Sequence, residues 1–443
     1  MKKLAYLLIL AFMVNLNLLS TSQPETQAAV HSPTGRMPVP KMPDGEIAKF
    51  LGPEIAISER VSDEYSPAIA YNSVHDQYLV VWENIWPGGH HDIYAQRISG
   101  DGRLLTWFAV ASGSHKQMEP AVAYDPVYDR YLVVWTYDTP GDSSNWDVYG
   151  RFSPWSGPDD NLTDFPLCDT TGNVGHPSVA YALTQQQFMV AWAEYPSGLA
   201  SYIRARRVFA AGGFPDPPFS ISNGLENRDR PDVAYNLTYN QFLVTWMVYK
   251  GSKSWDIYGL RYAAMGYVMP GGDPRVVGEF IISSFSAREE RPSVAACYYP
   301  NQYLVAWQSD EDTSGANYAI YARYLTGDAD PGSIFKVSST TLSSQEVDVD
   351  CDASGQKYML TWQVLFVNPV FAIFARQVYP NGSTGPEFGV VNPGPTSGRQ
   401  YPAVAGGQSS YLVVWEHIRE AVGNLDIHGR LLRYANFLPV IAK

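Results

Sequence analysis

Glu83 and Glu416 are the two carboxylates whose places in the sequence best suit acid–base chemistry. Each directly follows a tryptophan that closes a run close to the form Y/F-L/M-V-x-W, in the first and the last of seven such runs. Two carboxyl groups about 5–10 Å apart can cleave the sugar linkage between them. The pair therefore supports one hypothesis, a carbohydrate-active enzyme of the glycoside hydrolase type. The alternative is that both glutamates are solvated at a strand end.

Other kinds of active site find little support in the sequence. It lacks a G-x-S-x-G nucleophile motif and a glycine-rich phosphate loop. The eight histidines are scattered, and no HExxH or CxxC spacing predicts a zinc site. The formal net charge of −13 makes nucleic acid an unsuitable partner, because binding phosphates requires clustered Lys and Arg.

Three aspartates, Asp348, Asp350 and Asp352, alternate along a stretch that reads as a β-strand. Alternate residues of a strand share one face, so these carboxylates are expected about 6.6 Å apart in succession. A hard cation that prefers oxygen ligands, such as Ca²⁺, would neutralise them. The alternative is a water-filled channel wall without a metal, and no other cofactor is expected.

Aromatic residues recur in or beside the segments that follow the seven runs. They are Trp86, Tyr137, Trp146, Tyr195, Tyr249, Trp255 and Phe366. Exposed aromatic rings on a rigid scaffold suit stacking on sugars or anchoring a protein partner. The alternative is sideways packing against neighbouring loops. Four aspartates that open strands in the same region, Asp92, Asp147, Asp256 and Asp426, are expected to fix loop backbone.

The elements that must position these residues follow from a repeat. The tryptophans that close the seven runs lie 53 to 61 residues apart and are Trp82, Trp135, Trp192, Trp246, Trp307, Trp362 and Trp415. A fixed period of this size indicates repeated supersecondary units. The first unit divides into four predicted strands, namely residues 67–71, 78–82, 92–98 and 108–112. The second of them is apolar at every position and must therefore be covered on both faces.

The fourth strand of each repeat predicts how the repeats close into a ring. Six segments of the type FAVAS lie between successive tryptophans, and a seventh, EIAIS at residues 54–58, precedes the first repeat. If residues 54–58 pair with residues 426–432, the ring closes and no edge strand is left exposed. We therefore predict an all-β fold, a seven-bladed β-propeller with four-stranded antiparallel blades.

The repeat carries the motifs P-x-V-A-Y, Y-L-V-V-W and D-I-Y-G-x-R. With these motifs, residues 54–435 resemble bacterial secreted β-propellers. The resemblance implies an architecture and no particular activity, since such folds host unrelated functions.

The ends of the chain predict export. Residues 1–29 read as a signal peptide, residues 30–50 as a Pro/Gly-rich linker, residues 51–435 as the propeller and residues 436–443 as a short apolar tail. The protein is then secreted or displayed at the cell surface, with no membrane insertion after the signal is removed. Cys297 and Cys351 fall one alignment position apart in consecutive repeats. A bridge between them is one alternative, but we expect disulfides not to hold this fold.

Taken together, the sequence favours an exported binding or interaction module over an enzyme. Its ligand would be a glycan or an extracellular protein held by the aromatic loops. The carbohydrate-active enzyme using Glu83 and Glu416 is the first alternative. A structural component of the cell surface is the second.

Overall fold

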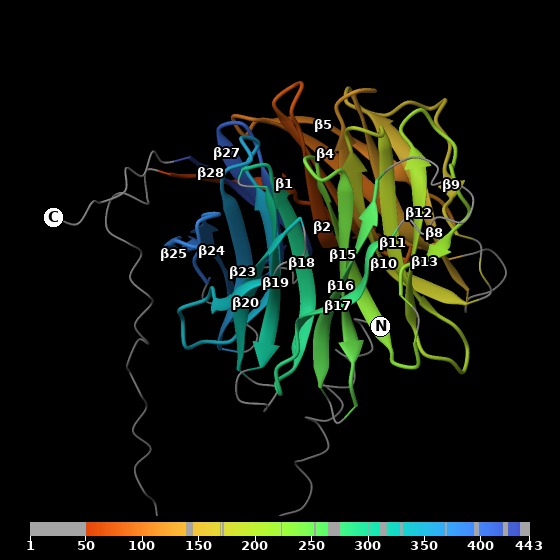
Figure 1. Ribbon diagram of the computed structural model, residues 1–443. Coiled ribbons are helices and arrows are strands. Elements are labelled where there is room, and N and C mark those ends of the chain that lie inside the picture. The colour runs from red at the N-terminus through yellow and green to blue at the C-terminus, as the bar shows by residue number, and fades with distance from the viewer. Residues whose placement is uncertain are drawn as a thin grey trace, which may run out of the picture. The chain divides into compact units, whose positions relative to one another are not determined.

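The computed structural model describes residues 50–434 apart from 139–144, 169, 171, 223, 252–253, 265–274, 300, 311–316, 328–330, 368–369, 394–397 and 420–423. The predicted signal peptide and tail, and the predicted linker up to residue 49, lie outside the described residues. Within them every regular element is a β-strand, and the strands form seven four-stranded antiparallel sheets. The predicted seven-bladed β-propeller is thereby confirmed (Figure 1).

Each blade pairs its strands in chain order from the axis outwards, except the last, which takes its outer strand from the N-terminal side. The strands are β2 (Asp63–Asn72), β3 (Gln77–Ile85), β4 (His91–Ser99) and β5 (Leu104–Ala111); β6 (Gln117–Asp125), β7 (Arg130–Asp138), β8 (Trp146–Pro154) and β9 (Phe165–Pro166); β10 (Asn173–Ala182), β11 (Gln187–Tyr195), β12 (Tyr202–Phe209) and β13 (Phe219–Ser220); β14 (Arg228–Asn236), β15 (Gln241–Tyr249), β16 (Trp255–Ala263) and β17 (Arg275–Ser283); β18 (Glu289–Cys297), β19 (Gln302–Asp310), β20 (Tyr318–Thr326) and β21 (Pro331–Lys336); β22 (Ser344–Cys351), β23 (Tyr358–Val367), β24 (Val370–Val378) and β25 (Thr384–Val391); and β26 (Arg399–Gly406), β27 (Ser410–Ile418), β28 (Leu425–Arg433) and β1 (Leu51–Ser58).

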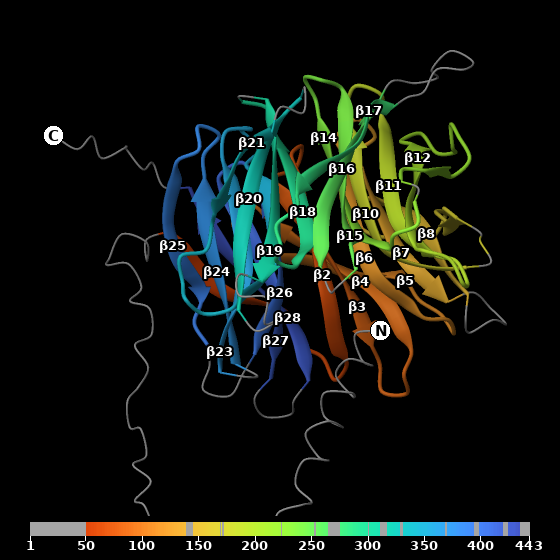
Figure 2. The ribbon, with the colours of Figure 1, turned by 60° about the horizontal axis from the view of Figure 1, so that its bottom comes forward.

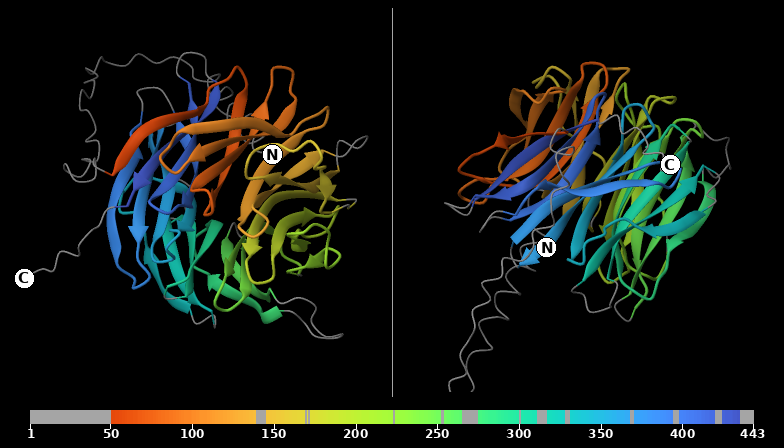
Figure 3. Two further views of the ribbon diagram at one scale, coloured as in Figure 1. Left: turned by 90° about the horizontal axis from the view of Figure 1, so that it is seen from above. Right: turned by 90° about the vertical axis from the view of Figure 1, so that its left-hand side faces the viewer.

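The first strand of every blade lies at the axis. Each of these seven strands contacts the first strand of the next blade, and β26 contacts β2, so the inner ring is complete. Figure 2 shows the sheets side by side, and Figure 3 (left) looks along the axis. The described residues include no helix with the length and apolar character of a membrane span.

The hydrophobic core is divided among the interfaces between blades. The tryptophan of each second strand is fully buried and packs with residues of the preceding blade. In β3, Tyr78, Val80 and Trp82 face the seventh blade, whereas Leu79 and Val81 face the second. The prediction that this strand is covered on both faces is confirmed.

The ring closes between the two ends of the described chain. Strand β1 pairs antiparallel with β28, with Glu54 opposite Arg430 and Ser58 opposite Ile427. Figure 3 (left) shows red β1 beside the blue last blade. The predicted pairing of residues 54–58 with residues 426–432 is confirmed.

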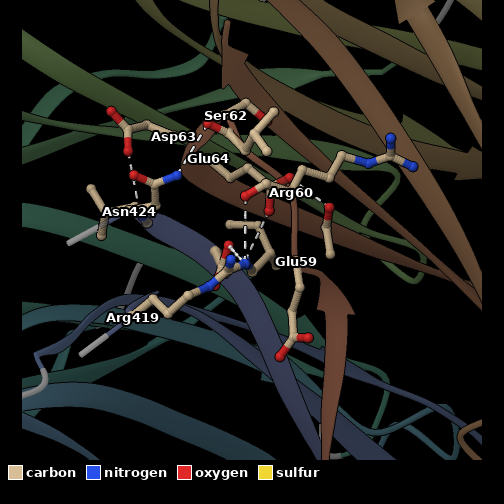
Figure 4. Close-up of polar contacts among 12 residues, drawn as sticks. Glu59, Arg60, Ser62, Asp63, Glu64, Arg419 and Asn424 are labelled. Carbon is tan, nitrogen blue, oxygen red and sulfur yellow. Dashed lines mark hydrogen bonds and ion pairs between the residues drawn. The ribbon is translucent and has the colours of Figure 1, made fainter. Parts of the chain in front are cut away.

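A network of polar contacts secures this closure (Figure 4). The Glu64 carboxylate, which is fully buried, accepts hydrogen bonds from Ser58 Oγ at 2.5 Å and from Ile427 N at 3.1 Å. Arg419 binds both carboxylate oxygens of Asp426, each at 2.8 Å. Burial raises the pKa of Glu64 to about 7.

One covalent link joins two blades. Cys297 at the end of β18 and Cys351 at the end of β22 form a disulfide with a Cα–Cα distance of 5.5 Å. The bridge that the sequence left as an alternative is therefore present. The same position in two adjacent inner strands brings the two cysteines within bonding range, because these strands lie at the narrow centre of the propeller.

The core predicts a large cost for removing an indole. Trp246→Ala should lower the free energy of unfolding by roughly 3–5 kcal/mol, because the flanking sheets cannot collapse into the cavity. Denaturant titration would measure the loss, with the exposed Tyr299→Ala as the control. A Trp246→Ala protein as stable as this control would contradict the packing.

The raised pKa of Glu64 predicts a stability that falls as the pH rises. The folded state holds this proton up to about pH 7, whereas the unfolded chain releases it near its ordinary value of 4.5. The difference amounts to about 3 kcal/mol lost across this window. Glu64→Gln, which cannot ionise, should flatten the decline in stability between pH 4.5 and 7. An equal slope in both proteins would contradict the assignment.

Candidate functional site

Every inner strand contains a β-bulge at the residue before the repeat's proline, or before Val347 in the sixth blade. The residue at the bulge has a positive φ, between 48° and 56°. We call these seven residues the mouth ring: Ser66, Glu119, His176, Arg230, Arg291, Glu346 and Tyr401. All seven are half-buried. A bulge turns a side chain out of the regular alternation, and such bulges occur beside active sites.

The two glutamates singled out in the sequence support this backbone. Glu416 Oε1 accepts a hydrogen bond from Ser66 N at 2.7 Å, and Glu83 Oε2 accepts one from Glu119 N at 3.4 Å. Glu83 Oε1 also contacts His91 Nδ1 at 2.7 Å. With exposed fractions of 7% and 1%, Glu83 and Glu416 are buried. They hold neighbouring bulges and are not solvated at a strand end, and their assignment as a catalytic pair remains an untested prediction.

Glutamines take the same role in other blades. Gln308 Oε1 accepts from Glu346 N at 3.0 Å, and Gln363 Oε1 accepts from Tyr401 N at 2.9 Å. The residue after the core tryptophan thus fixes the bulge of the next blade. Ala193 and Met247, at this position in the third and fourth blades, have no side-chain acceptor to offer.

In the third and fourth blades, carboxylates of the inner strands accept the hydrogen bonds of the bulge N–H groups. His176 N donates to Glu119 Oε2 at 3.0 Å, and Arg230 N donates to Asp229 Oδ1 at 2.7 Å. The His176 ring lies between these carboxylates, with Nδ1 3.3 Å from Glu119 Oε2 and Nε2 3.7 Å from Asp229 Oδ1. Tyr195 donates its hydroxyl proton to Asp229 Oδ1 at 2.6 Å. Two carboxylates thus contact opposite edges of one imidazole.

A second charged group lies on the fifth to seventh blades. Arg291 Nη1 forms an ion pair with Glu346 Oε2 at 2.5 Å. Burial, followed by the negative charge of Glu346, raises the pKa of the Tyr401 hydroxyl. The mouth ring therefore combines carboxylates, an imidazole, guanidinium groups and a phenol. These groups can transfer protons and bind the hydroxyl or anionic groups of a substrate.

The predicted aromatic residues lie near this ring but are less open than expected. Trp86, Tyr137, Trp146, Tyr195, Tyr249, Trp255 and Phe366 are all half-buried. Trp86 donates Nε1–H to Asp92 Oδ2 at 2.8 Å, and the rings of Tyr249 and Trp255 are 5.1 Å apart. Each contact lies within a single β-hairpin, so sideways packing against neighbouring loops also remains a prediction. Their role in ligand binding remains a prediction.

The acidic strand lines the axis within β22, and its carboxylates bind backbone of the neighbouring blade. Asp348 Oδ2 accepts from Val404 N and Asp350 Oδ2 from Gly406 N, both at 2.8 Å. Asp352 lies beyond the strand and accepts from Gln356 N at 2.7 Å. Burial raises the pKa of Asp348 and that of Asp350 to about 7. Calcium binding by the three aspartates remains a prediction.

Three of the four aspartates that open strands have hydrogen-bond partners in loops. Asp92 Oδ1 accepts from Gly113 N at 3.2 Å, and Asp147 Oδ1 accepts from Thr170 N at 3.2 Å. Asp426 pairs with Arg419, as described above. For these three, the structure agrees with the expected structural role.

Comparison with known proteins identifies the fold but no family. No family model matches the sequence, and no curated protein matches it. The structure is similar to the GH93 α-L-arabinofuranosidase of Fusarium graminearum in complex with arabinobiose, with a TM-score of 0.50, 12% identity, and coverage of 86% of this chain and 98% of that one. It is also similar to the polysaccharide lyase Uly1, with a TM-score of 0.53, 9% identity, and coverage of 87% and 99%. At these identities the likeness shows the fold.

The comparison corrects one expectation. The sequence favoured a binding module over an enzyme, yet the two similar propellers are an arabinofuranosidase and a polysaccharide lyase. The preference against an enzyme is withdrawn, because both of these structurally similar proteins are enzymes.

The hydrogen bond from Ser66 N to Glu416 predicts how substitution of Glu416 changes the stability of the protein. Glu416→Ala should destabilise the protein by about 1–3 kcal/mol, since Ser66 N loses its acceptor in a buried setting. Glu416→Gln retains an acceptor oxygen and should remain close to wild type. Denaturant unfolding of both variants measures the difference. Equal losses in the two would show that the charge matters, not the hydrogen bond.

Proposed function

We propose that the chain is a carbohydrate-active enzyme that cleaves a glycosidic bond at the mouth ring. One observation carries this proposal. A single backbone position, repeated in seven blades, carries Ser, Glu, His, Arg, Arg, Glu and Tyr, while the residue after it is proline in six of the seven. The blades share this backbone position, but its side chain differs from blade to blade. This is the pattern expected where a common scaffold carries a local chemical function.

The backbone strain of the mouth ring supports the same conclusion. Positive φ also occurs at the turns before the second strands, but mostly at Asp and Asn, for example Asp76 and Asn240, which tolerate it. The mouth ring places Arg, Glu, His and Tyr in this conformation. Such strain costs of order 1–3 kcal/mol per residue and clusters at active sites and ligand clamps.

The carboxylates on the two edges of His176 suit glycosidic cleavage. This reaction needs one carboxyl group to protonate the leaving oxygen and another to act as nucleophile or base, at separations of about 5–10 Å. Glu119 and Asp229 contact the two nitrogens of one ring, which keeps the contacting oxygens less than about 10 Å apart. We assign them as the acid–base pair, with His176 positioned between them.

The remaining members of the ring would bind the substrate. Arg291, held by Glu346, presents a fixed guanidinium, and Tyr401 lies within electrostatic range of both. Guanidinium and phenol groups donate hydrogen bonds to sugar hydroxyls or carboxylates. The half-buried aromatic residues of the adjacent loops would add stacking surface. In this proposal the partner is a glycan, and the protein meets it after export, outside the cell or at its surface.

The test measures cleavage of a panel of polysaccharides through the release of reducing ends, with variants of the mouth ring and of the adjacent Asp229. Glu119→Gln and Asp229→Asn should each lower kcat by about 10²–10⁴-fold, the usual contribution of general acid–base catalysis. Glu387→Gln, which changes a carboxylate of the outer strand β25, is the matched control and should retain activity. Thermal unfolding of each variant verifies that it is folded.

Two outcomes would contradict the assignment. Loss of activity in Glu83→Gln and Glu416→Gln, but not in the mouth-ring variants, would restore the pair first identified in the sequence. A glycan that binds the wild type and is never cleaved would make the chain a binding module.

A further inference from the structure

A separate cluster of potential ligands lies on the seventh blade, where the ring closes. Glu54 on β1, His417 on β27 and His428 on β28 each offer one donor atom, and these atoms all lie within 4.8 Å of one another. No other group of three His, Cys, Asp or Glu residues in the described part of the chain meets this criterion. The three residues are far apart in the sequence, which is why no spacing motif reveals them.

Strand register explains how they meet. In the β27–β28 pair His428 is opposite Trp415, so His417 lies two residues further along the same face. In the β1–β28 pair Glu54 is opposite Arg430, two residues from His428 on that face. The three side chains therefore form a diagonal line across the outer three strands of one sheet.

The side chains are mostly buried and incompletely satisfied. His428 Nδ1 lies 2.9 Å and His417 Nδ1 3.8 Å from Glu54 Oε1. The imidazole rings are stacked, with centroids 4.1 Å apart. The exposed fractions of the side chains are 10% for His428, 16% for His417 and 29% for Glu54. His417 Nδ1 and His428 Nε2 are buried atoms without a hydrogen-bond partner.

We infer that Glu54, His417 and His428 bind a divalent transition metal of the zinc type at the closure of the propeller. Two imidazoles and one carboxylate are an established donor set for Zn²⁺, with donor atoms about 2.0–2.2 Å from the ion. The stacked rings would have to turn so that one nitrogen of each points at the shared ion. Glu59 Oε1 lies 3.7 Å from His428 Nε2, on the edge of that ring away from Glu54, and would accept the remaining imidazole proton, while water would complete four-fold coordination.

The surrounding charges fit this arrangement. Arg430 Nη2 lies 3.7 Å from the other carboxylate oxygen of Glu54, Oε2, and so orients the group with Oε1 toward the histidines. Outer partners of this kind fix the orientation of metal ligands. The ion would link the N-terminal strand β1 to the C-terminal hairpin β27–β28. The ion would stabilise the closed ring and would take no part in the chemistry proposed at the mouth ring.

The test uses the full chain after chelation and dialysis. Elemental analysis and titration should find one equivalent of Zn²⁺ per chain, and Co²⁺ in its place should give the intense visible absorption of a four-coordinate site. Added Zn²⁺ should raise the melting temperature and slow proteolysis at β1, since a ligand that binds only the folded state stabilises it. Binding of less than one equivalent, or of metal that does not change the melting temperature, would overturn the inference.

Variants distinguish the site from adventitious binding. His417→Ala and His428→Ala should each weaken Zn²⁺ binding by more than about 10-fold, the loss that removal of an outer partner alone can cause. Glu54→Gln retains the shape of the side chain and should do the same, which covers the case in which a histidine variant fails to fold. His90→Ala removes an exposed histidine elsewhere and should bind as wild type. Equal binding by all four variants would overturn the proposal.

Discussion

The pairing of β1 with β28 is the interaction on which the rest of the structure depends. Each second strand is apolar on both faces, so every blade needs a neighbour on each side. Only a closed ring gives the first blade a neighbour on its second side, and the cluster containing Trp82 and Leu412 lies between the first and seventh blades. A fully buried glutamate, Glu64, hydrogen-bonds both sides of this joint, to Ser58 and Ile427. The disulfide between two blades, the polar contacts and the apolar packing thus all help to hold the seven sheets in one closed ring around the axis.

The sequence predicted the architecture because the architecture is periodic. The tryptophan spacing identified the blades, and the unpaired segment at residues 54–58 identified the closure. The mouth ring was not predicted, although its signal is present. The residue before the repeated proline varies from Ser66 to Tyr401 while its surroundings repeat. The residue before a proline ordinarily adopts an extended conformation, and the predicted strand began at the proline itself, so the sequence indicated no bulge at this position.

The same bulges explain the burial of Glu83 and Glu416, whose assignment as a catalytic pair stays a prediction. A glutamate after a core tryptophan reads as the last residue of a strand that emerges into solvent. In the structure the next blade turns its backbone N–H toward that carboxylate, so each glutamate supports a bulge of the mouth ring. Sequence spacing cannot reveal this contact, because donor and acceptor belong to different blades. The disulfide between Cys297 and Cys351 was underestimated for the same reason.

The acidic strand follows from the geometry of the inner ring. Each inner strand is the edge of its own sheet, so the N–H groups that face the next blade have no ladder partner. Asp232 Oδ2 accepts from Val294 N at 2.8 Å, and Asp348 and Asp350 do the same for the seventh blade. Where an alanine takes the place of these aspartates in an inner strand, its side chain offers no acceptor to the N–H groups of the next blade. Carboxylates at the axis therefore satisfy an inner edge, and burial raises their pKa values because solvent is scarce there. A structural demand of the fold thus accounts for this strand with or without a cation.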